Sequence, residues 1–117
     1  MKNIIYGLVA GRHNVPASNF IFDSIDNVLD FNALEKSAMS VLYPIVKDIA
    51  PTSFITMDSD GCECYSKEKY RANLVVYVTG LSSALIALLN VCRQLSIKVQ
   101  LMHYDTTTAS YSCQNVY

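Results

Sequence analysis

The 117-residue sequence predicts an α/β fold, as one small Rossmann-like domain over residues 1–117. We expect a mostly parallel sheet with helices on its faces and a C-terminal antiparallel hairpin. Three observations predict this class. The length suits one domain with a single core. Hydrophobic residues make up 51% of the chain and charged residues 16%, which excludes disorder. Strand-like apolar runs alternate with helical patterns, as in parallel sheets.

The first strand is expected at residues 3–10, because Ile4 to Val9 is a mostly apolar run. Apolar residues on both faces indicate a central strand. Residues 11–18 are rich in Gly, Asn, Pro and Ser and lack periodicity, so a loop is predicted there. A short apolar stretch follows at residues 20–25.

The first helix is expected to begin after Asp30, a residue suited to cap a helix N-terminus. Apolar residues then recur at helical spacing as far as Ile49. Pro44 should kink or split this helix, and Pro51 should end it. Residues 52–71 are harder to interpret: they contain a candidate short strand at 54–57, a turn at 58–61 and a charged segment at 67–71.

Residues 74–78 give the strongest strand signal, a β-branched and aromatic run without a polar member, so a fully buried parallel strand is predicted. The helix expected after it, residues 81–95, is apolar nearly all round. We expect one side to pack on the sheet and another to form a subunit interface, which predicts a homodimer or larger homo-oligomer.

The last part of the chain predicts two strands. Residues 97–104 alternate between apolar and polar, as in a half-exposed strand, and His103 falls on the apolar side. We therefore expect His103 to be a hydrogen-bonded core residue rather than a catalytic one. Residues 106–108 should turn the chain, and residues 109–117 should return as an antiparallel edge strand.

Composition narrows the classes of partner. The formal net charge is −1, so bulk DNA binding is not expected. The run at residues 4–10 is too short for a signal peptide, and no apolar stretch has the length of a membrane span, which predicts a cytoplasmic protein without membrane contact. The four cysteines lack the spacing of a zinc site, and no metal or cofactor is predicted.

The candidate site lies where three loops follow the carboxyl ends of parallel strands, since ligands of open sheets bind there. In the loop after residues 74–78, Thr79 and Gly80 precede Ser82 and Ser83. We expect Gly80 to allow a close turn, either serine to cap the helix, and the helix N-terminus to attract a phosphate. The alternative is that these residues only make the turn and the cap. No dinucleotide or P-loop motif is present.

The loop after the first strand contributes Arg12, His13 and Asn14 to the predicted site. Arginine offers a planar fork to phosphate or carboxylate, and histidine can donate to a phosphate or act as an acid or base. The alternative is a surface arginine and a histidine bonded within its own loop. The third loop is Tyr104-Asp105-Thr106.

The run Val75-Val76-Tyr77-Val78-Thr79-Gly80-Leu81-Ser82-Ser83-Ala84 resembles the strand-to-helix loop of CRISPR-associated Rossmann-fold (CARF) domains. The loop at residues 11–14 falls where those domains place a second ligand loop. The resemblance covers about 45 residues and lacks the second glycine and the basic residue often found there. It implies a nucleotide ligand, such as a cyclic oligonucleotide bound across a homodimer, and a stand-alone binder or ring nuclease in phage defence.

Three functions stay open on the sequence alone. The first is binding of a nucleotide or another phosphorylated small molecule by a homodimer, with sequestration or slow cleavage. The second is a non-catalytic protein-interaction module of a phage or mobile element, which would use the apolar second helix and the tyrosine-rich edge strand. The third is a metal-free hydrolase that uses His13 or His103.

Overall fold

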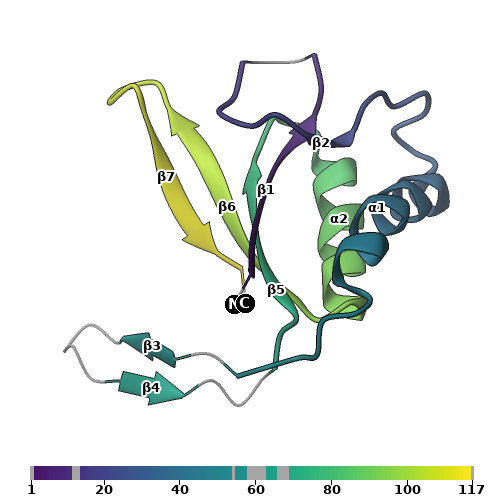
Figure 1. Ribbon diagram of the computed structural model, residues 1–117. Coiled ribbons are helices and arrows are strands. Elements are labelled where there is room, and N and C mark those ends of the chain that lie inside the picture. The colour runs from purple at the N-terminus through teal and green to yellow at the C-terminus, as the bar shows by residue number, and fades with distance from the viewer. Residues whose placement is uncertain (1, 12–13, 54, 58–62, 66–68, 117) are drawn as a thin grey trace.

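The computed structural model describes residues 2–11, 14–53, 55–57, 63–65 and 69–116 (Figure 1). Two helices and seven strands are assigned within these residues. In chain order they are β1 (Lys2–Val9), β2 (Phe20–Phe22), α1 (Phe31–Val46), β3 (Ile55–Met57), β4 (Glu63–Tyr65), β5 (Ala72–Tyr77), α2 (Ser82–Gln94), β6 (Ile97–Asp105) and β7 (Ser110–Asn115).

Five of the strands form one sheet in the order β2-β1-β5-β6-β7. β1 pairs in parallel with β2 and β5, β5 pairs in parallel with β6, and β7 runs antiparallel to β6. The predicted α/β class and the C-terminal antiparallel hairpin are therefore confirmed. β2 lies inside the short apolar stretch at residues 20–25 and adds a parallel strand on the outer side of β1.

Both helices cover the same face of this sheet (Figure 1). The connections from β2 to β5 through α1 and from β5 to β6 through α2 cross the sheet in the same direction. Because such crossovers are right-handed, both helices must lie on one side. The connection from β1 to β2 runs the other way, and its described residues contain no helix. Among the described residues, no helix covers the second face.

The core lies between the helices and the alternate strand residues that face them. On the sheet these buried side chains include Ile4, Ala72, Leu74, Val76, Ile97, Val99 and Leu101. Their neighbours in sequence point to the open face, where Ile5 is 52% exposed and Val75 and Tyr77 are half-buried. β1 is central and β5 is parallel, as predicted, but the expectation of a fully buried strand at residues 74–78 is wrong because that strand is covered on one face only.

The first helix begins where the sequence predicts. Asp30 is its N-cap, and Oδ1 of Asp30 accepts a hydrogen bond from the N–H of Ala33 at 3.2 Å. Of the kink or split expected at Pro44, the split is wrong, since α1 runs through Pro44 and ends at Val46, before Pro51. Pro44 lies in the last turn, where the missing N–H removes a single bond to the carbonyl of residue 40 and little helix remains to disrupt.

The second helix differs from the expectations in its N-cap and in what its apolar sides contact. Its N-cap is Leu81, which makes no side-chain capping bond, so neither Ser82 nor Ser83 caps the helix. The side of α2 that we expected at a subunit interface packs largely on α1 of the same chain. Ile86 is an exception, with 57% of its side chain exposed. The apolar character of α2 is thus mostly explained within one chain.

Between α1 and β5 the chain forms a separate antiparallel pair, β3 with β4, which extends away from the main sheet (Figure 1). A bridge between Thr52 and Tyr70 joins the two chain segments at its base. The predicted strand at residues 54–57 is confirmed for 55–57, whereas the predicted turn at 58–61 and part of the charged segment at 67–71 lie outside the described residues. Neither described helix has the length and apolar composition to cross a membrane.

Candidate functional site

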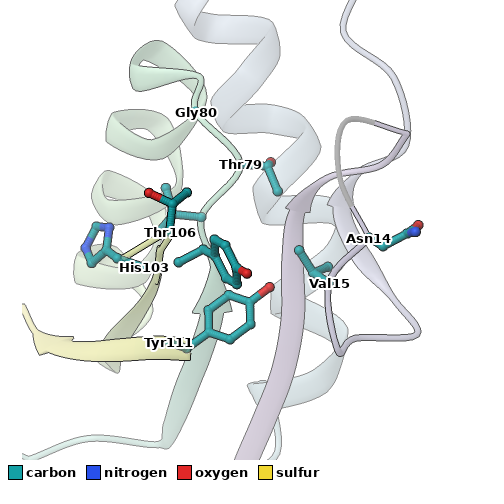
Figure 2. Close-up of a pocket in the computed structure, with 9 residues that line it drawn as sticks. Asn14, Val15, Thr79, Gly80, His103, Thr106 and Tyr111 are labelled. Atoms are coloured by element: carbon teal, nitrogen blue, oxygen red, sulfur yellow. The ribbon is translucent and has the colours of Figure 1, made fainter. Parts of the chain in front are cut away.

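A cavity of about 660 Å³ lies at the carboxyl edge of the parallel strands, where the sequence places the candidate site (Figure 2). Four segments contribute to it: the loop after β1, the end of β5, the end of β6 with its turn, and the start of β7. Its lining residues are Asn14, Val15, Val78, Thr79, Gly80, His103, Tyr104, Thr106 and Tyr111.

Thr79 joins the ends of two strands. Its side chain is buried, and its Oγ1 accepts a hydrogen bond at 3.3 Å from the N–H of Val9 at the end of β1. A buried N–H that lacked this partner would be costly. Thr79 therefore fixes the end of β1 relative to the end of β5 beside the cavity.

Gly80 makes the turn from β5 into α2 with a φ of +96°. That conformation is easy for glycine and strained for residues that carry a Cβ atom. No neighbouring atom lies within 4 Å of the position that a Cβ atom would take, so the backbone conformation, and not close contact, explains the glycine. The turn leads directly through Leu81 to the first residue of α2.

Three tyrosines form a cluster on the open face beside the cavity. The ring centroid of Tyr111 lies 4.9 Å from that of Tyr77 and 5.3 Å from that of Tyr104, and both pairs are edge-to-face. Tyr104 and Tyr111 line the cavity and are opposite one another across the β6–β7 hairpin. Figure 2 shows the ring of Tyr111 extending towards Val15 of the loop after β1.

Tyr104 was expected within a loop, and the cluster was not predicted from the sequence. The predicted hairpin was close to the observed one: the expected turn covers residues 106–108, whereas the observed turn over residues 106–109 pairs Tyr104 with Tyr111. Directly opposed residues of an antiparallel pair point to the same face. Tyr77 precedes the Thr79-Gly80 turn by two residues and lies on that same face.

His103 is not a core residue, which corrects the prediction. Its ring is half-buried and lies on the other face of the sheet from Tyr104, as the alternation along β6 requires. Nε2 of His103 lies 2.8 Å from Oε1 of Gln114 on β7. Figure 2 shows the imidazole pointing away from Tyr111. β7 is the edge strand of the sheet, so the hydrogen bond between His103 and Gln114 lies near the sheet edge and outside the core under the helices.

The predicted site residues fall into three groups. Asn14, Thr79 and Gly80 line the cavity together. Arg12 and His13 lie outside the described residues. Ser82 and Ser83 instead line a second cavity of about 520 Å³ between the start of α1 and α2, together with Leu29, Phe31, Glu35, Ile86, Ala87 and Asn90.

The described side chains in the main cavity offer hydroxyl, amide and imidazole groups but no carboxylate. Within the described part of the chain, His, Cys, Asp and Glu side chains form no group of three that could hold a metal ion. Neither a protein-family model, nor a curated protein, nor a solved structure matches this sequence. The resemblance to CARF domains stays a prediction.

Proposed function

We propose that this protein binds a nucleotide, or another phosphorylated small molecule with a planar ring, in the cavity at the carboxyl edge of its sheet. One observation carries the proposal: the cavity has two tyrosine rings on one side and the Thr79-Gly80 turn before a helix N-terminus on another. Its volume of about 660 Å³ falls in the usual range for small-molecule sites.

The tyrosine side of the cavity suits a planar ring. Tyr104 is 54% exposed, so a large part of its ring area is open to a ligand. The ring of Tyr111 packs edge-to-face against both Tyr77 and Tyr104, which limits its rotation in the free protein. A ligand that stacks on this ring therefore costs less side-chain entropy. Stacking of a base on an aromatic side chain contributes roughly 1–3 kcal/mol.

The glycine side suits an anionic group. α2 begins two residues after Gly80, and its N-cap Leu81 makes no side-chain capping bond, so the N–H groups of its first turn carry partial positive charge. Asn14 and Thr106 add neutral hydrogen-bonding groups to the cavity. We assign the full positive charge to Arg12, which stands two residues before Asn14 in the sequence.

We further propose that the protein acts as a homodimer and sequesters its ligand, or cleaves it only slowly. His103 is the one imidazole among the described lining residues, and it is already hydrogen-bonded to Gln114. A general acid or base must instead reach the reacting group. A cyclic oligonucleotide is the ligand that the resemblance to CARF domains suggests, and His13 would be the residue to examine if product appeared.

The test is a thermal-shift panel of mono-, di- and cyclic oligonucleotides, because a ligand that binds the folded state raises its stability. We expect Tyr104→Ala and Arg12→Ala each to weaken the binding of the stabilising ligand by about ten- to a hundredfold. Tyr43→Ala is the matched control, since Tyr43 is similarly exposed, at 50%, but lies on α1. A panel without any stabilising ligand, or equal losses in Tyr43→Ala and Tyr104→Ala, would contradict the proposal.

A second candidate is a non-catalytic protein-interaction module, favoured by exposed apolar side chains around the second cavity. Leu29, Phe31 and Ile86 are exposed by 70%, 55% and 57%. Grouped exposed apolar residues often mark a protein contact. Phe31→Ser separates the candidates: it should leave nucleotide stabilisation unchanged if the carboxyl-edge cavity is the functional site, and it should abolish a protein complex formed through this surface.

A further inference from the structure

The outer edge of β7 is the most exposed pairing surface of the sheet. β7 pairs with β6 over six residues in unbroken register, and its other side has no neighbouring strand in the five-stranded sheet. Proteins usually protect such an edge with a charge, a proline, a bulge or a short strand. Residues 110–115 contain no charged residue and no proline. The opposite edge, β2, is only three residues long.

The hydrogen-bonding groups on this edge can be assigned from the register. The N–H of Val116 donates to the carbonyl of Val99 at 3.1 Å, so those two residues form a hydrogen-bonded pair. Such pairs alternate along an antiparallel ladder, which directs the backbone groups of Ser112 and Gln114 towards β6. The N–H and C=O groups of Tyr111, Cys113 and Asn115 consequently face outward.

A bond on the far side of β6 supports this assignment. The carbonyl of Met102 accepts from the N–H of Val78 at 3.1 Å, so the backbone of Met102 faces β5. Cys113 is opposite Met102 in the hairpin. A residue of β6 that bonds to β5 does not also bond to β7, and its opposite residue on β7 is therefore left with outward groups.

We propose that two copies of this chain pair through β7, antiparallel and around a two-fold axis at Cys113, to form one continuous sheet of ten strands. This deepens the homodimer part of the proposed function by naming the interface, and it does not depend on the ligand. Tyr111 would then be opposite Asn115 across the new ladder. This register uses the outward groups of all three residues, whereas an axis at Ser112 would use those of Tyr111 and Cys113 alone.

Charge and symmetry favour a second copy over an unrelated strand. A two-fold axis at Cys113 places that side chain opposite its own copy and the other β7 side chains within a few residues of theirs, so like charges on β7 would repel across the new ladder. None of the six residues is charged. An antiparallel strand is also complementary to itself, because the donor and acceptor of one residue meet the acceptor and donor of its symmetry mate.

The dimer would leave both cavities intact. An axis perpendicular to the sheet keeps the helices of both copies on one side and joins the two open faces into one surface. The lining side chains lie at the carboxyl edge and on the open face, whereas the pairing uses the outward backbone groups of β7, so the cavity does not require a wall from the second copy. A monomeric variant should therefore still bind the ligand, which separates this inference from the proposed function.

Disulfide trapping at Cys113 is the first test. Cys113 is exposed and unbonded, and opposed residues of a hydrogen-bonded pair have Cα atoms about 5.5 Å apart, within the disulfide range of about 4.4–6.8 Å. We expect mild oxidation of a Cys62→Ser/Cys64→Ser background to give a cross-linked dimer, in which the remaining Cys92 is buried. Cys113→Ser should remove the cross-link.

Light scattering of Cys113→Lys is the second test. This change places two ammonium groups at the axis, so we expect a monomer at a concentration of tens of micromolar at which wild type and Cys113→Ser are dimers. Ser40→Lys, an equal change of charge on the exposed side of α1, should stay a dimer. Amide exchange at Tyr111 and Asn115 should be slowed in wild type and fast in Cys113→Lys.

A monomeric wild type would overturn the proposal. A dimer that survives Cys113→Lys and forms no Cys113 cross-link would overturn it too, and would move the interface to the surface around Phe31. Dimers at β7 without any stabilising nucleotide would instead refute only the ligand part of the proposed function.

Discussion

The two faces of the five-stranded sheet are made of alternate residues from the same strands, and they differ in almost every property. Under the helices the strand residues are aliphatic and buried, as at Leu74 and Val76. On the open face an amide ladder crosses four strands and gives way to tyrosines at the carboxyl edge. The covered face holds the fold together, and the open face leaves room for the proposed binding site.

The largest expected difference is between Ile4 and Ile5, adjacent isoleucines of β1 on opposite faces. Ile4 is 7% exposed and Ile5 is 52% exposed. Ile4→Ala should lower the free energy of unfolding by about 2–4 kcal/mol, since it leaves a cavity in the core. Ile5→Ala should lower it by less than about 1 kcal/mol. Urea unfolding of both variants measures the contrast, and equal losses would mean that the open face is covered in solution.

The two described free cysteines give the second contrast. Burial raises the pKa of Cys92 to about 12, so its thiol stays protonated in the folded protein, whereas Cys113 is exposed on β7. In dilute native protein at pH 8 we expect Cys113 to react with an aromatic disulfide at least about a hundredfold faster than Cys92. Mass spectrometry of the labelled peptides identifies each site. Comparable rates would show that α2 opens readily.

The raised pKa also predicts how stability depends on pH. Below about pH 9 the Cys92 thiol is protonated in both the folded and the unfolded chain, so its full contribution to the free energy of unfolding is present there. As the pH rises from 9 towards 12 only the unfolded chain loses the proton, and the contribution falls by about 1.4 kcal/mol per pH unit. The advantage of wild type over Cys92→Ala in urea unfolding should shrink over that range and stay constant below it.

The same contrast explains what the sequence could and could not predict. Strand positions, the parallel pairing and the Asp30 cap follow from local patterns. Local patterns did not predict the open face. Val75 and Tyr77 are apolar although they lie on it, so a run such as residues 74–78 does not reveal whether helices cover one face of the strand or both. Coverage depends on the direction of the two crossovers, which is set by the strand order and not by any local pattern.

The candidate site was predictable in part for a similar reason. The carboxyl edge and the Thr79-Gly80 turn follow from the order of strands and helices. The division of the loop between two cavities depends on α1, because residues of its first turns line the second cavity together with Ser82 and Ser83. The tyrosine cluster needed the exact hairpin register, which the sequence placed only approximately.

Thr79 offers a smaller test at the junction of the two faces. Thr79→Val keeps the shape of the side chain but removes the oxygen that accepts from the N–H of Val9. The unpaired buried N–H should cost about 1–3 kcal/mol of unfolding free energy. Thr107→Val, in the exposed turn before β7, should change it by less than about 0.5 kcal/mol. Equal losses of unfolding free energy in Thr79→Val and Thr107→Val would show that the bond to Val9 does not hold the two strand ends together.

The smallest effect is expected in the amide ladder of the open face. Nδ2 of Asn73 donates to Oδ1 of Asn3 at 3.2 Å and to Oε1 of Gln100 at 2.9 Å, and a third bond joins Gln100 to Asn115. Water can replace a partner at the exposed Asn3. Oδ1 of Asn73 is itself buried without a hydrogen-bond partner, and its removal offsets part of the loss.

Asn73→Ala should therefore lower the unfolding free energy by no more than about 1 kcal/mol, and Asn73→Val should be neutral within about 0.5 kcal/mol, because a β-branched residue suits the strand. Asn3→Ala, which removes a single exposed bond, is the control. Urea unfolding at a protein concentration below that of any self-association makes the comparison. A loss above about 2 kcal/mol in Asn73→Val would show that the amide ladder stabilises the sheet as strongly as the aliphatic face does, and the distinction between the two faces would then apply to their chemistry but not to their energetics.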